Sequence, residues 1–253
     1  MTARGPLDAA RAEALRGWLR RARGCPGAGG LVLRGSLFLQ AICAGARPAM
    51  DVDYVVPGPF DPEALERLAR AIAERPDDGT TIVVERCEII FGETPFPGLR
   101  VFATGESAEG SASFQVDFAH GDPLPAAPRE VAIAGVGGVL ACTAEALFGW
   151  KLHGLVEFGR GTWRAKDLFD LWLLRTRVPL DREALLAAVR LAFSSRSAEL
   201  SALSDFRSRE SWGESRSGRR RWRILCNKHP VSPPFAEARA VVRAAVEELL
   251  GAG

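Results

Sequence analysis

The feature that most constrains the fold is a change in the pattern of apolar residues near Thr143. Upstream of it, helical segments alternate with segments rich in β-branched and aromatic residues, separated by Gly and Pro as is typical of strands. Downstream of it, apolar residues recur at helical spacing. This order predicts an α+β fold, with a mixed sheet domain of about four or five strands in residues 1–135 and a helical lobe in residues 136–253. The strand-like segments are 31–34, 51–56 and 80–118.

Turn-forming and helix-capping residues mark the boundaries of these elements. Residues 121–138 are rich in Pro and Gly and are expected to form a linker between the two parts. Residues that can cap the free N–H groups of a first helical turn stand before several helical segments. These residues are Asp61, Thr143, Thr162 and Asp181.

Composition narrows the class of protein. The 253 residues include 33 basic and 31 acidic side chains, a net charge of +2, which argues against a protein that coats nucleic acid. The five cysteines are scattered without a C-x-x-C pair, so we expect a reducing compartment rather than disulfides or zinc. No apolar signal core and no run of membrane-spanning length are found, so we expect a cytoplasmic protein with no membrane partner.

A strand runs directly into a Gly-Ser turn and a helix at Gly35 and Ser36. A helix start offers free backbone N–H groups and the positive end of the helix dipole. Gly35 would let a phosphate approach the backbone closely, and the Ser36 hydroxyl would add a donor. Such a turn is more often ordinary structure than a phosphate site, so its interpretation depends on the residues that follow.

Carboxylates follow on the predicted sheet. Asp51 and Asp53 are two residues apart on one strand, so their side chains face the same side. Adjacent carboxylates repel each other, and Mg²⁺ would relieve that repulsion while bridging to triphosphate oxygens. If the strand that carries Asp117 lies beside them, two carboxylates could hold metal while the third acts as general base. The alternative is a solvated strand edge.

The C-terminal half offers a second group of charges. Lys151 lies on the edge of an apolar helical stripe, where it needs a partner, a cleft or a path to solvent. Lys166, Asp167 and Asp170 cluster on one side of a helix that is apolar nearly all round. Such charges should line a cleft or pair with one another, and a Lys166–Asp170 ion pair is the plain structural alternative. We expect this lobe to complete the active-site cleft.

Several segments, in their order and spacing, resemble the nucleotidyltransferase AbiEii/AbiGii toxin family, a type IV toxin-like branch of the DNA polymerase β-type superfamily. The resemblance runs from about Leu31 to about Phe193. It implies a nucleotidyltransferase fold, an NTP substrate, Mg²⁺ and, commonly, a cognate antitoxin. The segments are LVLRGSLFLQ, RPAMDVDYVV, FPGLRVFA, FQVDFAHGDPL, EALFGWKLHGL and RAKDLFDLWLL.

The resemblance also implies roles for residues of the sheet domain. Gly35 and Ser36 match the Gly-Ser motif that binds the triphosphate. Asp51 and Asp53 match the metal-binding Asp-x-Asp pair. Asp117 stands where members carry an Asp, and we assign it to catalysis and to the metal.

In the helical lobe, Lys151 matches the lysine that contacts phosphate, and we assign it to both nucleotide binding and catalysis. Lys166, Asp167 and Asp170 match a Lys-Asp-x-x-Asp motif, with Lys166 as a nucleotide contact, Asp167 catalytic and Asp170 supporting. The sequence departs from the family at two positions: Trp150 replaces the usual Glu, and Arg34 replaces a common Lys. Arginine keeps the charge with a different geometry, so Arg34 remains a nucleotide-binding candidate.

These residues favour Mg²⁺-dependent transfer of NMP from an NTP to an RNA, as a type IV toxin-like protein, because the characterised relatives attach nucleotides to tRNA ends or use GTP. A small-molecule nucleotidyltransferase of the antibiotic-modifying kind and a non-catalytic nucleotide-binding or antitoxin-binding module are the alternatives. Residues 216–225 place several arginines around Trp222. They could grip an RNA backbone or form a solvated helix face, with Trp222 expected in the core.

Overall fold

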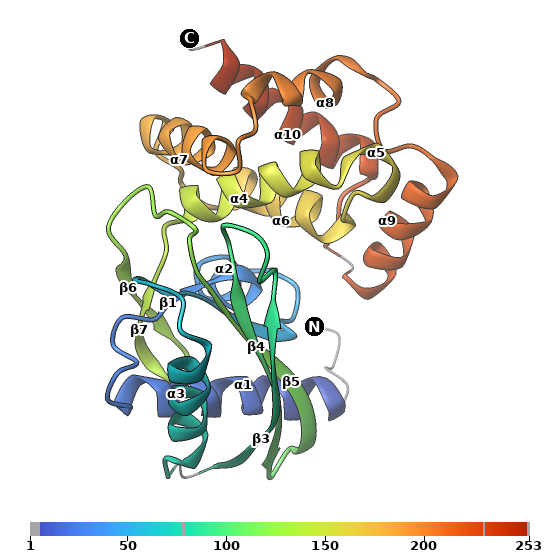
Figure 1. Ribbon diagram of the computed structural model, residues 1–253. Coiled ribbons are helices and arrows are strands. Elements are labelled where there is room, and N and C mark those ends of the chain that lie inside the picture. Colours follow the sequence, from blue (N-terminus) through green and yellow to red (C-terminus); the bar gives the residue numbers. More distant parts are fainter. Residues whose placement is uncertain (1–5, 77–78, 230, 252–253) are drawn as a thin grey trace. The chain divides into compact units, whose positions relative to one another are not determined.

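The computed structural model of the chain describes residues 6–76, 79–229 and 231–251 and divides into two compact units. The first unit comprises the chain up to Ile42 together with Arg47–Asp122 and Pro128–Cys142, and the second comprises Cys43–Ala46, Pro123–Ala127 and the chain from Thr143 onward. The first unit holds the sheet and the second is helical, as the element order predicts (Figure 1).

The first unit is built on a mixed sheet, which confirms the predicted α+β class. Across the sheet the strand order is β3-β4-β5-β2-β1-β7-β6. The β2–β5 and β1–β7 pairs are parallel and the other pairs are antiparallel. The strands are β1 (Val32–Arg34), β2 (Asp51–Val55), β3 (Thr80–Ile90), β4 (Gly98–Ser107), β5 (Gly110–Ala119), β6 (Arg129–Ile133) and β7 (Gly137–Ala141).

The expectations of four or five strands and of a linker over residues 121–138 are wrong. The described residues form a seven-stranded sheet, because β6 and β7 pair as an antiparallel hairpin within that segment. Gly135 and Gly137 have φ angles of 76° and 100°, a backbone region that favours glycine. The glycines that suggested a linker therefore form the tight turn of a hairpin.

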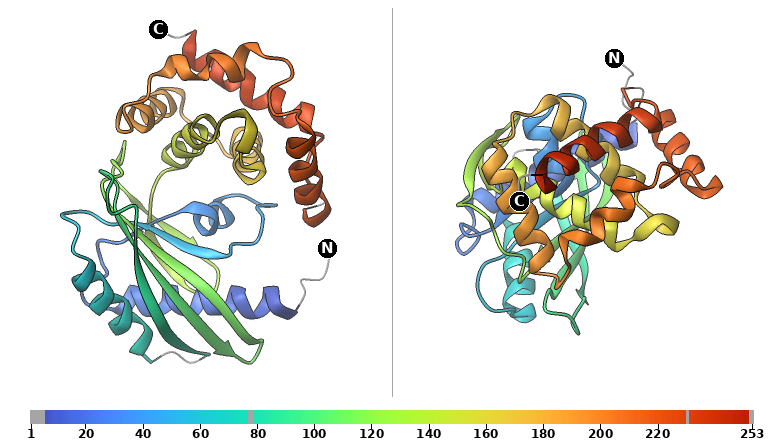
Figure 2. Two further views of the ribbon diagram at one scale, coloured as in Figure 1. Left: turned by 45° about the vertical axis from the view of Figure 1, so that its right-hand side comes forward. Right: turned by 90° about the horizontal axis from the view of Figure 1, so that it is seen from above.

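One face of this sheet is apolar and is covered by α1 (Pro6–Gly24) and α3 (Pro62–Glu74) (Figures 1 and 2). Trp18 of α1 is fully buried and meets Phe114 of β5 edge-on, with ring centroids 6.1 Å apart. Tyr54 of β2 stacks on Phe118 of β5 at 5.6 Å. Because side chains alternate along a strand, this packing leaves the polar positions of β2 and β5 on the other face.

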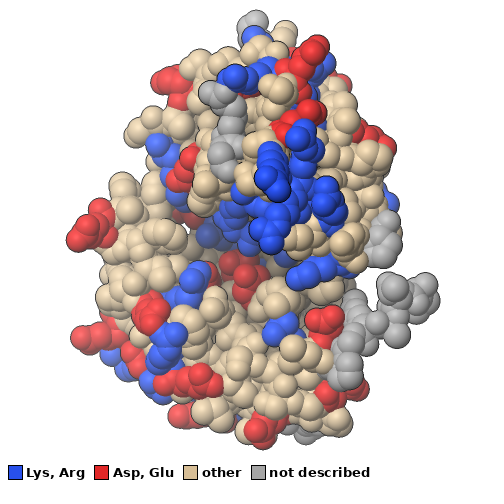
Figure 3. All heavy atoms as spheres, turned by 90° about the vertical axis from the view of Figure 1, so that its right-hand side faces the viewer, with Lys and Arg blue, Asp and Glu red and all other residues tan. Residues whose placement is uncertain are grey.

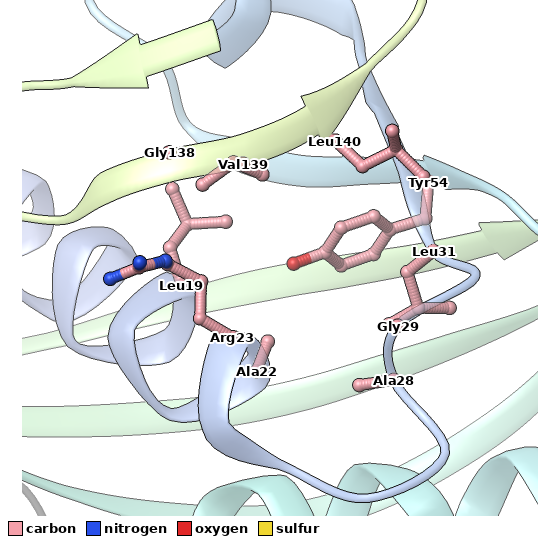
Figure 4. Close-up of a pocket in the computed structure, with 10 residues that line it drawn as sticks. All are labelled: Leu19, Ala22, Arg23, Ala28, Gly29, Leu31, Tyr54, Gly138, Val139 and Leu140. Carbon is pink, nitrogen blue, oxygen red and sulfur yellow. The ribbon is translucent and has the colours of Figure 1, made fainter. Parts of the chain in front are cut away.

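A cavity of about 170 Å³ lies on the apolar face. Figure 4 shows the Tyr54 side chain extending into it, between Leu19 of α1 and Val139 of β7. Most of the side chains that line it are apolar, and Tyr54 faces away from the neighbouring Asp53. This cavity is therefore separate from the carboxylates.

The second unit packs α4 against α6 and α7, and α6 against α9 and α10. Helix α6 is buried nearly all round, as its composition predicts. Its helices are α4 (Ala144–Glu157), α5 (Gly159–Thr162), α6 (Ala165–Arg177), α7 (Arg182–Ser194), α8 (Ser204–Ser208), α9 (Arg216–Lys228) and α10 (Phe235–Leu250), with a 3₁₀ turn at Leu200–Leu203. Among the residues that the structure describes, no helix combines the length and apolar character needed to cross a bilayer.

Side-chain caps start α3, α4 and α7, as predicted. Asp61, Thr143 and Asp181 accept from backbone N–H groups of the first turns at 2.9, 3.2 and 2.8 Å. The prediction for Thr162 is wrong, because its hydroxyl donates to the Phe158 carbonyl at 2.5 Å instead. Thr162 ends α5, and α6 begins without a side-chain cap.

Candidate functional site

A row of charged side chains crosses the polar face of the sheet. Strand register places Asp53 of β2 opposite Arg34 of β1 on one side and opposite Asp117 of β5 on the other. Arg100 of β4 lies opposite Asp117. Residues paired across neighbouring strands face the same side, so Arg34, Asp53, Asp117 and Arg100 form what we call the charged row. The strand that carries Asp117 thus lies beside the Asp-x-Asp strand.

The Gly-Ser turn abuts this row. Gly35 has a φ of +74°, and a Cβ atom on it would lie 1.9 Å from Oδ2 of Asp53. Only glycine leaves room for the carboxylate there. The Ser36 hydroxyl donates to Oδ1 of Asp51 at 3.2 Å. Helix α2 (Gly35–Ile42) begins at this turn, so its positive end lies next to the two carboxylates.

Arg100 is the residue of this row that the sequence interpretation missed. Its Nε and Nη2 donate to the two carboxylate oxygens of Asp117 at 2.8 and 2.7 Å. Hydrogen bonding to Asp117, reinforced by the charges of Asp51 and Asp53, raises the pKa of Arg100. The available signal was its position between Leu99 and Val101, which places an arginine on the polar face of a strand.

Arg34, the expected nucleotide contact, is engaged at the other end of the row. Its Nη1 donates to Oδ2 of the buried Asp122 at 2.6 Å. Burial lowers the pKa of Arg34, but the charges of Asp122 and Asp53 more than offset that effect, so its pKa is raised. A fixed positive charge therefore stands beside Asp53.

Asp51 and Asp53 suit a hard cation such as Mg²⁺, because they present carboxylate oxygens on one face next to a glycine that leaves them room. The expected group of three carboxylates around one ion is not formed. Across the described ranges, no set of three or more His, Cys, Asp or Glu side chains is arranged to hold a metal ion. In place of a shared ion, Asp117 has Arg100 as its cation. Metal binding by Asp51 and Asp53 stays a prediction.

A groove of about 270 Å³ borders Asp51 where β2 begins. Gln115 and Phe102 line it, and the register places Gln115 opposite both Asp51 and Phe102. The guanidinium of Arg86 lies 3.5 Å from the centre of the Phe102 ring. An aromatic ring and an amide thus flank the carboxylates on the polar face.

The second unit contains its own charge cluster, between α4 and α6. Nζ of Lys151 lies 2.6 Å from Oδ2 of Asp170 and 3.3 Å from Oδ1 of Asp167. Nε of Arg164 also lies 3.3 Å from Asp167. The Asp170 side chain is 0% exposed and that of Lys151 is 10% exposed, so this ion pair is buried. Asp170 of α6 is thus paired with Lys151 of α4. Lys166, also on α6, is half-buried.

Two known structures have a similar fold along nearly the whole chain. The crystal structure of JHP933 from Helicobacter pylori aligns with a TM-score of 0.59 and 16% identity, covering 99% of this chain and 94% of that one. A second H. pylori structure, provisionally assigned as a nucleotidyltransferase, aligns with a TM-score of 0.57 and 15% identity, covering 97% and 95%. No curated protein matches the chain. The chain therefore shares the fold of these two structures.

The family follows from the sequence itself. Residues 19–244 match the family described as nucleotidyl transferase AbiEii toxin of type IV toxin–antitoxin systems, and the chain belongs to it. The protein is thus a nucleotidyltransferase. Membership implies an NTP substrate and an antitoxin partner.

Proposed function

We propose that this protein transfers NMP from an NTP to an RNA, the 3′ end of tRNA, in a Mg²⁺-dependent reaction. The observation that carries the proposal is the contact of the Gly35 turn with Asp53, at the start of α2 and beside the charged row. A nucleotidyltransferase needs a phosphate-binding turn next to carboxylates, and this contact supports the proposal because it brings a glycine turn at a helix start against a carboxylate.

The residues of the first unit suit a direct transfer. Backbone N–H groups at Gly35 and Ser36 would bind the triphosphate, and Asp51 and Asp53 would hold Mg²⁺. When bound, Mg²⁺ withdraws negative charge from the phosphate oxygens. The acceptor hydroxyl oxygen forms a bond to the α-phosphorus, the bond to pyrophosphate breaks, and Asp117 takes the hydroxyl proton. Arg100 orients Asp117, whose oxygens each retain a second lone pair for the acceptor.

In the second unit, we propose that Lys151 and Lys166 contact the nucleotide and that Asp167 takes part in catalysis. Asp167 lies in the first turn of α6, where the helix dipole favours a carboxylate. Asp170 holds Lys151 in place through their 2.6 Å ion pair. These roles are those of the family motif that the residues match.

Substitutions of Asp51 and Asp53, the proposed Mg²⁺ ligands, provide the test. Asp51→Asn and Asp53→Asn keep the side-chain size but remove the charge that Mg²⁺ needs. In the first variant, the amide oxygen can still accept from the Ser36 hydroxyl. Each variant should abolish transfer of labelled NMP while remaining folded. In wild type, Mg-NTP at 100-fold excess over its Kd should stabilise the fold by about 2.7 kcal/mol, and the variants should show much less.

Asp8→Asn, an exposed position on α1 in the same unit, is the matched control and should behave as wild type. The acceptor is identified by offering total tRNA, protein and small hydroxylated compounds with each labelled NTP. If Asp53→Asn keeps both activity and the ligand-induced shift, the carboxylates are ordinary surface. Label on small compounds but not on tRNA would contradict the proposed acceptor.

A further inference from the structure

Helix α9 exposes a line of basic side chains to solvent, which we call the α9 stripe. It contains Arg216, Arg219, Arg220, Arg223 and Lys228. No acidic residue interrupts the helix. Figure 3 shows Lys and Arg side chains gathered on the face of the second unit that it displays. With the 1.5 Å rise of a helix, the stripe spans roughly 18 Å.

The inner side of α9 fixes the stripe outward. Gly218, Trp222 and Leu225, at i, i+4 and i+7, are buried, and the Trp222 indole donates to the Pro233 carbonyl at 3.2 Å. The prediction that Trp222 lies in the core is thus confirmed. A packed inner face leaves the stripe as a rigid, preorganised surface.

The stripe also places positive charge at the N-terminal end of α9, which is the positive end of the helix dipole. Arg216 and Arg219 lie in the first turn of α9, which contains no acidic residue. Positive side chains at the positive end of a helix dipole are unfavourable. An anion bound there would relieve both the repulsion between arginines and that with the dipole.

We propose that the α9 stripe binds the phosphate backbone of RNA. A protein partner would need an apolar centre to its interface, but Ile224 is the single large apolar residue that α9 exposes. A membrane would need the apolar side of α9, which is buried in the unit. Guanidinium groups spaced along a helix match a chain of phosphates, and interfaces with nucleic acid are polar and basic.

Helix α9 packs next to α6 within the same unit. The Trp222 ring lies 6.4 Å from that of Trp163, and the Arg221 guanidinium lies 5.7 Å from the Trp163 ring. Trp163 comes directly before Arg164 and shortly before Lys166 in the chain. Helix α9 therefore packs beside the residues that lead into the Lys-Asp-x-x-Asp motif. We assign the stripe as the docking surface for the acceptor, and this assignment rests on the proposed function.

The test is RNA binding without chemistry. Fluorescein-labelled total tRNA and an unrelated RNA hairpin are titrated with the full chain in EDTA without NTP, and anisotropy is followed at several salt concentrations. Replacing Arg219, Arg220 and Arg223 together by Gln should weaken binding to both RNAs about tenfold or more at ~100 mM salt. The slope of log K against log salt should become shallower by about 2 to 3, one phosphate contact per arginine.

The matched control removes the same charge elsewhere in the unit, by replacing the exposed Arg182, Arg190 and Arg207 by Gln. Equal losses in both triple variants would overturn the proposal, because they would reflect net charge alone. Unchanged binding by the α9 variant, or α9-dependent binding of polyglutamate or anionic vesicles by a chain that does not bind RNA, would overturn it too.

The two proposals fail in different ways. RNA binding that depends on α9, with no transfer of label to RNA, leaves the stripe as an RNA-binding surface and defeats the proposed transfer. Transfer to tRNA that proceeds with unchanged RNA affinity in the α9 variant defeats the stripe and leaves the proposed function in place.

Discussion

Asp170→Asn is the substitution whose effect on stability follows most directly from the structure. The Asp170 carboxylate is fully buried, and its Oδ2 lies 2.6 Å from Nζ of Lys151. Asparagine keeps the size of the side chain and removes its charge. The ammonium of Lys151, only 10% exposed, would lose its closest carboxylate and keep the longer Asp167 contact at 3.3 Å.

Removing one partner of a buried ion pair is destabilising by about 3–5 kcal/mol, because the other charge is left poorly compensated. Asp167 retains part of that compensation, so we expect the lower end, about 3 kcal/mol. Urea unfolding followed by tryptophan fluorescence is a suitable assay, since every tryptophan except Trp18 belongs to the second unit. The midpoint should fall while the m-value stays constant.

Asp205→Asn is the matched control in the same unit. Its side chain is 42% exposed and lies 3.8 Å from Arg209, so the loss should stay below about 1 kcal/mol. Adding Lys151→Met to Asp170→Asn should recover part of the loss, because the buried ammonium is removed. A loss below about 1 kcal/mol for Asp170→Asn, or a further loss on adding Lys151→Met, would refute the reasoning.

Two further substitutions probe the charged row. Gly35→Ala forces a side chain into a positive-φ position and places a Cβ atom within 1.9 Å of Asp53. Scanning fluorimetry should therefore show a lower Tm and no rise in Tm when Mg-NTP is added. A rise in Tm as large as that of wild type would refute the close approach. Arg100→Gln removes the cation that pairs with Asp117, which frees the Asp117 carboxylate for a metal ion. Calorimetry should therefore show tighter binding of Mn²⁺ to the charged row. Unchanged or weaker binding would show that Asp117 does not contribute to metal binding when Arg100 is removed.

The polar face of the sheet shows which features can be predicted from local sequence pattern. Strand period alone places Asp51 and Asp53 on one side, and glycine chemistry alone marks Gly35 as a site of close approach. In the structure the group that lies against Gly35 is the Asp53 carboxylate, and the approach of a phosphate stays a prediction. Caps at Asp61, Thr143 and Asp181 were readable for the same reason, since a cap and its N–H partner are three residues apart.

What the sequence by itself determined is therefore the set of features that depend on neighbours along the chain: the main helices, the carboxylate strand, the Gly-Ser turn and the family motifs. Only the tertiary structure decided which charges meet. Arg100 and Asp117 are 17 residues apart, and Arg34 and Asp122 are 88 apart. Those pairs depend on the register of strands and on helix packing, and no periodicity within a segment specifies the residue that lies opposite on another segment.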